Sequence, residues 1–110
     1  IKRAGINVSP AEIETLLLQH PDVAQAAVVG AAAGERGEAI VAFVVLKPSA
    51  EVDADELRAH CRALASSYKV PDHVELCAAL PVTETGKLFR RALRSMAESL
   101  VSAASQQVKV

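Results

Sequence analysis

The feature that most constrains the fold is an unbroken apolar run near the middle of the chain, residues 40–46, with the sequence IVAFVVL. An apolar run without polar alternation is typical of a strand that is covered on both faces. Pro48 follows the run and would end the strand. Residues 23–30, which are rich in alanine and valine, and residues 74–77 are predicted to be two further short strands. We therefore expect a sheet of roughly three strands with residues 40–46 at its centre.

Three amphipathic segments around these strands predict helices. Ser9 and Asp53 are each followed by glutamate three residues later, which is the capping pattern of a helix N-terminus. Pro10 suits the first position of the first helix. The predicted buried positions, read from helical spacing, are Ile13, Leu16, Leu17 and His20, then Leu57, His60, Cys61 and Leu64, then Phe89, Ala92, Leu93, Met96 and Leu100.

Composition limits how these elements can pack. Aromatic residues make up only 3% of the chain, so the core must consist of Ala, Val, Leu and Ile, which pack well between a sheet and helices. The expected fold is α+β, a small two-layer domain with helices packed on a central, roughly three-stranded sheet. Two loops complete it, one at the N-terminus and one, residues 81–87, that carries a lysine before the last helix.

The length of the chain fits a single domain. Its 110 residues, of which 51% are hydrophobic, are enough to bury a core. We expect this domain to span residues 1–100 and residues 101–110 to form a disordered tail. The chain begins at Ile1, with no start methionine and no polar lead-in segment. We therefore expect it to be part of a longer protein.

Charge and hydropathy argue against several functional classes. The formal net charge of -1 gives no overall attraction to nucleic acid or to an anionic membrane, and Arg90, Arg91 and Arg94 are expected to form a solvated helix face. No apolar run approaches the roughly 18 residues of a membrane span, and the first residues lack the apolar core of a signal peptide. These features favour a cytoplasmic protein.

The cysteine and histidine patterns indicate no metal site. Cys61 and Cys77 lie 16 residues apart without a C-x-x-C partner, so we expect buried free thiols rather than a zinc site or a disulfide. His20, His60 and His73 are too scattered along the chain for a catalytic or metal-binding cluster.

Residues 81–90, with the sequence PVTETGKLFR, carry the most chemical information. A lysine just before a helix start lies near free backbone N–H groups and suits a site where negative charge collects on phosphate or carboxylate oxygens. A Walker phosphate-binding loop does not fit, because Leu88 replaces the metal-binding hydroxyl residue and Pro81 stands where its first glycine belongs. On this pattern alone, a solvated exposed turn is the ordinary interpretation.

The same segment resembles the last core motif of the adenylate-forming superfamily, P-x-T-x-T-G-K-x-x-R. The start of the chain resembles the motif that opens the C-terminal domain in that family, I-K-x-x-G-x-x-V-x-P-x-E-I-E, and the similarity extends to about residue 100. The matching residues are Pro81, Thr83, Thr85, Gly86, Lys87 and Arg90 in the first motif, and Ile1, Lys2, Gly5, Val8, Pro10, Glu12, Ile13 and Glu14 in the second. Within the superfamily, the chain looks most like an AMP-forming acyl-CoA synthetase.

This resemblance implies that the chain is the mobile C-terminal domain of a ligase that makes an acyl-adenylate from ATP and a carboxylic acid. Lys87 would be the catalytic lysine, which contacts the substrate carboxylate and the ribose and phosphate oxygens, with Gly86 beside it at the nucleotide. The resemblance implies ATP, Mg²⁺ and coenzyme A as cofactors, bound mainly by a large N-terminal adenylating domain that would be the partner of this one. The isolated chain is expected to be inactive.

The resemblance also implies a second role, in thioester formation. The small domain would swing about a hinge and bring the loop of Gly5 to the active site, where it lines the tunnel for the pantetheine arm. Ala4 and Ile6 would form the walls, and Asn7 stands where some relatives use an arginine near phosphate. The remaining expected CoA contacts are Tyr68, against the adenine, and Lys69, at the phosphates.

Two alternatives stay open at this point. The chain could be the lid of an adenylation domain that transfers acyl groups to the thiol of a carrier protein. It could also be a non-catalytic α+β interaction module that keeps the fold without the chemistry.

Overall fold

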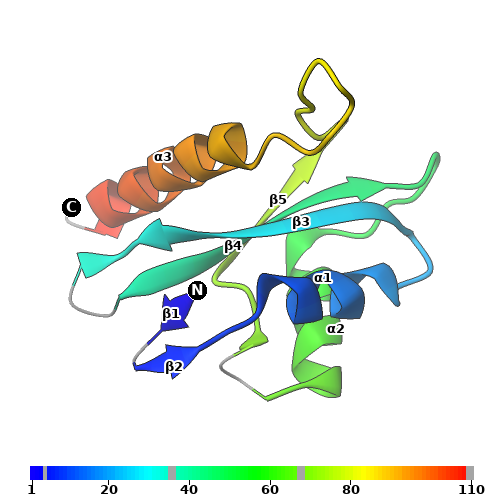
Figure 1. Cartoon of the computed structure of the whole chain (residues 1–110). Coiled ribbons are helices and arrows are strands. Elements are labelled where there is room, and N and C mark those ends of the chain that lie inside the picture. The colour runs from blue at the N-terminus through cyan, green and yellow to red at the C-terminus, as the bar shows by residue number, and fades with distance from the viewer. Residues whose placement is uncertain (4, 35–36, 67–68, 109–110) are drawn as a thin grey trace.

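The computed structural model of the chain describes residues 1–3, 5–34, 37–66 and 69–108. Its main sheet has the strand order β3 (Val23–Ala32), β4 (Glu38–Leu46), β5 (His73–Cys77), so β4 is central (Figure 1). Strand β3 runs antiparallel to β4, and β5 runs parallel to it. Five consecutive residues of β4, numbers 40–44, are completely buried. The predicted central strand, covered on both faces, is therefore confirmed.

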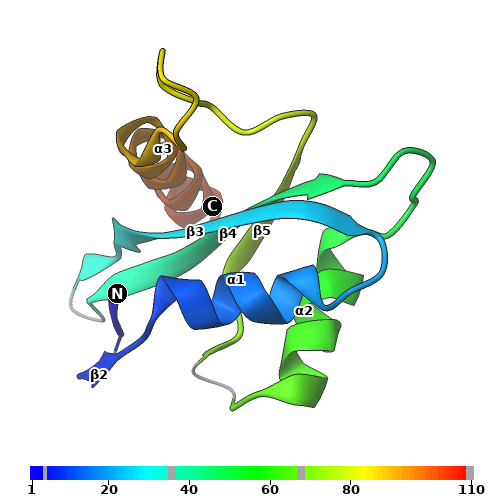
Figure 2. The ribbon, with the colours of Figure 1, turned by 45° about the vertical axis from the view of Figure 1, so that its right-hand side comes forward.

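Helices cover both faces of this sheet. Helices α1 (Pro10–Leu18) and α2 (Ala54–Leu64) lie on one face, and α3 (Arg90–Val108) lies on the other (Figures 1 and 2). Side chains alternate along β4, so that Ile40, Ala42 and Val44 pack into the core with α1 and α2, whereas Val41 and Phe43 pack with α3. The predicted α+β class and three-stranded sheet are confirmed. Helix α3 adds a third layer to the two that the sequence predicted.

The first two helices begin where the sequence predicted. The hydroxyl of Ser9 accepts a hydrogen bond from the backbone N–H of Glu12 at 3.4 Å, and the carboxylate of Asp53 accepts one from Glu56 at 2.8 Å. Each side chain therefore satisfies one of the N–H groups that a helix start leaves unpaired.

The last helix differs from its prediction. Leu93 and Ala97 are buried, but Phe89 and Met96, which the sequence placed on the buried stripe, are 39% and 43% exposed. The helix starts only at Arg90, so Phe89 precedes it. Its buried face is centred on Leu93 and Ala97, and Met96 lies roughly a quarter turn around the helix from that centre. Helix α3 continues to Val108 through a segment without glycine or proline. The expected disorder of residues 101–110 stays a prediction. No helix within the described residues is long and apolar enough to cross a bilayer.

The predicted N-terminal loop is a short hairpin. Strands β1 (Lys2–Arg3) and β2 (Ile6–Asn7) pair antiparallel, and the backbones of Ile1 and Val8 extend the pairing with hydrogen bonds of 3.0 and 2.7 Å. In Figures 1 and 2 this hairpin lies on the α1 side of the sheet, whereas the loop between β5 and α3 rises on the opposite side.

Candidate functional site

The loop that carries Lys87 is more regular than the sequence predicted. Val82 and Leu88 form an antiparallel bridge, and the N–H of Thr83 donates to the carbonyl of Lys87 at 2.7 Å. The N–H of Phe89 closes the base of the loop by donating to Pro81 at 2.9 Å. The loop is therefore a small hairpin stem that presents its tip outward.

Glycine and hydroxyl side chains form the turn of this loop. Gly86 has a φ of 85°, in the left-handed region that side-chain-bearing residues rarely adopt. The backbone N–H of Lys87 donates to the hydroxyl of Thr83 at 3.2 Å, and this hydroxyl lies 3.0 Å from that of Thr85. The motif match selected both threonines without giving them a role. The structure shows that Thr83 binds the backbone of Lys87 and that Thr85 contacts Thr83.

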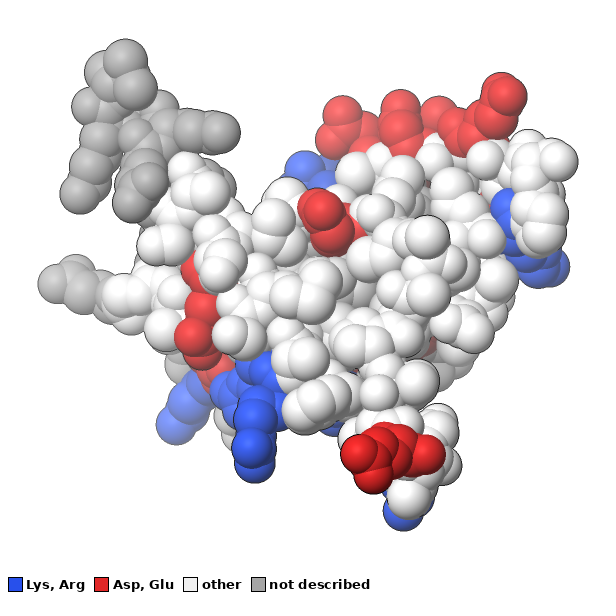
Figure 3. Space-filling view, turned by 90° about the horizontal axis from the view of Figure 1, so that it is seen from above, with Lys and Arg blue, Asp and Glu red and all other residues white. Residues whose placement is uncertain are grey.

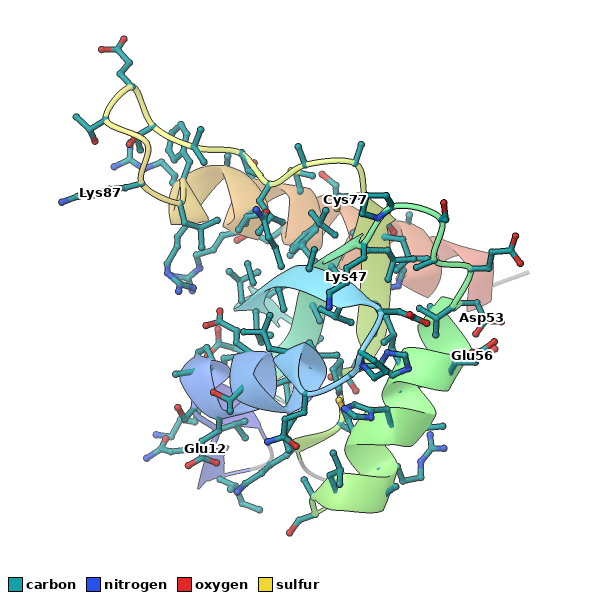
Figure 4. All side chains as sticks on the ribbon, turned by 90° about the vertical axis from the view of Figure 1, so that its right-hand side faces the viewer. Glu12, Lys47, Asp53, Glu56, Cys77 and Lys87 are labelled. Atoms are coloured by element: carbon teal, nitrogen blue, oxygen red, sulfur yellow. The ribbon has the colours of Figure 1, made fainter. Side chains whose placement is uncertain are left out.

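The side chain of Lys87 is exposed and extends away from the sheet and helices (Figure 4). Among the described residues, no carboxylate lies within ion-pair distance of its ammonium group. A lysine that is neither buried nor paired inside its own domain can contact an anionic group outside that domain.

At Gly5, the N-terminal hairpin presents bare backbone. Gly5 has a φ of 80°, and no atom lies within 4 Å of the position that a Cβ would take. Ile6 is 43% exposed and Asn7 is also exposed. Ala4, the other predicted wall of the tunnel, lies outside the described residues. The structure does not bring this hairpin and Lys87 together.

Lys69, which is expected to bind the CoA nucleotide, lies elsewhere again. The ammonium of Lys69 is 2.8 Å from the carboxylate of Glu12, at the edge of an open cavity of about 540 Å³ between α1 and the end of α2. An anionic ligand here would compete with Glu12 for Lys69, a partner that sequence reasoning missed. Tyr68 lies outside the described residues.

On the face seen from above, acidic side chains lie along the upper edge, and basic side chains gather toward the lower left with acidic side chains beside them (Figure 3). Two arginines of α3 form ion pairs, Arg90 with Glu14 at 3.5 Å and Arg94 with Glu38 at 3.6 Å. The predicted solvated basic face is therefore partly neutralised. Arg90 and Glu14 are both motif residues, which is the signal that could have suggested their pairing.

The cysteines lack the environment of a nucleophile. Both are free thiols, with Cys61 buried and Cys77 half-buried. Burial raises the pKa of the Cys61 thiol. Burial and the charge of Glu75 raise the pKa of Cys77, and a hydrogen bond with the backbone of Val44 opposes that rise. Both thiols are therefore held in the unreactive protonated form at neutral pH.

The histidines have structural contacts. The rings of His20 and His60 meet edge to face with centroids 5.1 Å apart, and His60 donates to the carbonyl of Leu16 at 2.7 Å. His73 lies 3.0 Å from the carboxylate of Glu75. Within the described residues, no group of three or more His, Cys, Asp or Glu side chains could hold a metal ion.

Comparison with known proteins places this geometry in a family. Residues 12–87 match the family described as AMP-binding enzyme C-terminal domain. The chain is 43% identical over 100 residues to the acetyl-coenzyme A synthetase of Streptomyces avermitilis, a match that covers 87% of this chain and 15% of that protein.

Two solved structures give the same result. The acyl-CoA synthetase of Brucella canis is 38% identical, with a TM-score of 0.80 over 89% of this chain and 18% of its own. The amide bond synthetase McbA of Marinactinospora thermotolerans is also 38% identical, with a TM-score of 0.83 over 87% of this chain and 19% of its own. The chain thus spans less than a fifth of the length of each. Because the family match covers most of the chain, including Lys87, the chain belongs to the family of AMP-binding enzyme C-terminal domains.

Proposed function

We propose that this domain is the C-terminal part of an AMP-forming acyl-CoA ligase, which joins a carboxylic acid to ATP as an acyl-adenylate and then forms the CoA thioester. The observation that carries the proposal is the exposed ammonium of Lys87, placed just after Gly86 at the tip of a hydrogen-bonded loop. The similarity to an acetyl-coenzyme A synthetase and an acyl-CoA synthetase supports it.

In the adenylation step, Lys87 would act by electrostatics. Negative charge builds on the oxygens around the α-phosphorus as the substrate carboxylate attacks. A cation held in place at that point stabilises the transition state by roughly 3–4 kcal/mol. The turn formed by Thr83 and Gly86 fixes the backbone from which the lysine extends. Lys87 is thus the catalytic residue of this domain, with Gly86 beside it at the nucleotide.

In the thioester step, the Gly5 hairpin would take the place of Lys87. A backbone without Cβ can line a tunnel narrow enough for the pantetheine arm. Ile6 and Asn7 would flank that arm together with Ala4. The two loops lie on opposite sides of the sheet (Figures 1 and 2), so one active site could use both only in turn. Rotation of the whole domain between the steps follows from this arrangement.

The cofactors and partner follow from these two steps. ATP, Mg²⁺ and most of CoA would be bound by a large N-terminal adenylating domain, to which this domain contributes Lys87 and the Gly5 hairpin. Lys69 and Tyr68 would contact the CoA nucleotide, after Lys69 exchanges Glu12 for phosphate. A cytoplasmic location and a role in fatty acid metabolism belong to the same proposal.

A second candidate concerns only the acceptor of the acyl group. The similarity to an amide bond synthetase indicates that this fold also occurs in an enzyme named for a product other than a thioester. A carrier-protein thiol or an amine could therefore replace CoA. The family match, which includes Lys87, and the similarity to acyl-CoA synthetases favour either ligase over a non-catalytic module.

The test uses the full-length protein with ATP, Mg²⁺ and a panel of carboxylic acids from acetate to long-chain fatty acids. The expected result is acid-dependent exchange of pyrophosphate into ATP, and formation of a thioester when CoA is added. Exchange without thioester formation, but with transfer to a carrier protein or an amine, would support the second candidate. Absence of exchange with every acid would refute both.

A further inference from the structure

Glu14 and Arg90 meet at the outer edge of the sheet, although 76 residues separate them in the sequence. Strand β3 is an edge strand, so Val28 has a backbone N–H and C=O that no neighbouring strand can pair. The Glu14 carboxylate accepts a hydrogen bond from this N–H at 2.8 Å, and Arg90 donates to this carbonyl at 3.4 Å. Glu14 is only 17% exposed. The pair thus joins α1, β3 and the first turn of α3.

Glu38 forms a second bridge at the start of β4. One carboxylate oxygen accepts a hydrogen bond from the backbone N–H of Lys2, in the hairpin, at 3.0 Å. The other lies 3.6 Å from the guanidinium of Arg94. Gly30 makes this position possible, because a Cβ there would come within 2.4 Å of the second oxygen. The hairpin is therefore tied to the sheet and to α3 through one side chain.

The two bridges share one helix face. Arg90 and Arg94 are four residues apart, so they lie on the same face of α3, about one turn from each other. Both line the same cavity of about 260 Å³ beside Ile1 and Gly30. Lys87 precedes Arg90 by three residues, and Gly5 follows Lys2 by three. Each functional loop thus has one carboxylate bridge at its base.

We propose that these carboxylates are positioning residues: Glu14, through Arg90, sets the orientation of the Lys87 loop, and Glu38, through Lys2 and Arg94, sets that of the Gly5 hairpin. The inference rests on the proposed ligase activity. A displacement of a catalytic group by about 1 Å is enough to slow a reaction substantially. Because each bridge serves one loop, each should affect one half-reaction.

The test compares Glu14→Gln and Glu38→Gln in the full-length protein. Glutamine keeps an oxygen that can accept the backbone hydrogen bond, but it removes the charge that attracts arginine. Glu14→Gln should lower kcat for acid-dependent adenylation about tenfold, with KM for ATP nearly unchanged, and alter thioester formation from supplied acyl-adenylate less than about twofold. Glu38→Gln should show the reverse. Glu51→Gln, at an exposed glutamate outside both bridges, is the matched control.

A double variant separates positioning from loss of fold. If Glu14 acts through Arg90, Glu14→Gln combined with Arg90→Gln should be no slower in adenylation than the slower single variant. Equal loss of both half-reactions in Glu14→Gln, or additive losses in the double variant, would overturn the proposal.

Hydrogen exchange gives a readout that needs no catalysis. In Glu14→Gln, the amides of Lys87 and Phe89 should exchange several-fold faster than in the unchanged protein, whereas Glu38→Gln should leave them unaltered. Unchanged exchange in Glu14→Gln would refute the bridge. If the unchanged protein makes no adenylate but Glu14→Gln still speeds this exchange, the proposed function is refuted and the structural role of the bridge is supported.

Discussion

The Gly5 hairpin and the Lys87 loop are built alike but expose different chemistry. Each is a short antiparallel turn closed by a glycine in the left-handed region, with φ of 80° at Gly5 and 85° at Gly86. The Lys87 loop presents a charged side chain, and the hairpin presents backbone with open space around it. The difference teaches that one loop should be sensitive to the loss of a side chain and the other to the gain of one.

The largest expected effect comes from removing the charge. Lys87→Ala in the full-length protein should slow acyl-adenylate formation by about 100- to 1000-fold, because the transition-state oxygens lose their cation. Thioester formation from supplied acyl-adenylate should remain largely intact. Measuring the two half-reactions separately checks this, with Lys47→Ala at another exposed lysine as the control. Equal loss in both half-reactions would contradict the division of roles.

Adding a side chain to the hairpin should give the reverse pattern. Gly5→Leu should slow thioester formation roughly 10- to 100-fold by filling the path of the pantetheine arm, and leave adenylation nearly unchanged. Gly34→Leu is a matched control, because Gly34 also has a positive φ, 68°, and open space at its Cβ position. If both variants lose thioester formation equally, backbone strain rather than a blocked tunnel is the cause.

The smallest effect should come from the turn under Lys87. Thr83→Val removes the hydroxyl that accepts from the N–H of Lys87 and should lower the adenylation rate about threefold, as expected for one exposed hydrogen bond. Thr83→Ser keeps the hydroxyl and should restore most of the rate. A serine variant as slow as the valine variant would show that the methyl group, not the hydrogen bond, matters.

Features that depend on local sequence could be predicted, including both loops of this comparison. The central strand and both helix caps depend on residues close together in the chain, so local patterns were enough. Lys87 and Gly5 were found through motifs, which need no knowledge of contacts. The structure confirms that both are exposed but leaves their roles as proposals.

Contacts between distant segments could not be read in this way. The pairing of Glu14 with Arg90 depends on how α1 and α3 flank the same strand, and periodicity carries no such information. The exposure of Met96 had the same origin, because apolar residues lie around much of α3 and the sheet alone decides which of them are buried. The side of the sheet that α3 would cover was likewise set by tertiary packing.

The two side chains at Val28 have one further consequence, for self-association. An uncovered edge strand offers its free N–H and C=O groups to a strand from another copy, which is the first step of ordered aggregation. Glu14 and Arg90 occupy both groups with charged side chains, so an incoming strand would have to displace them and leave their charges unpaired. The same two residues at the base of the Lys87 loop therefore also oppose strand addition at this position.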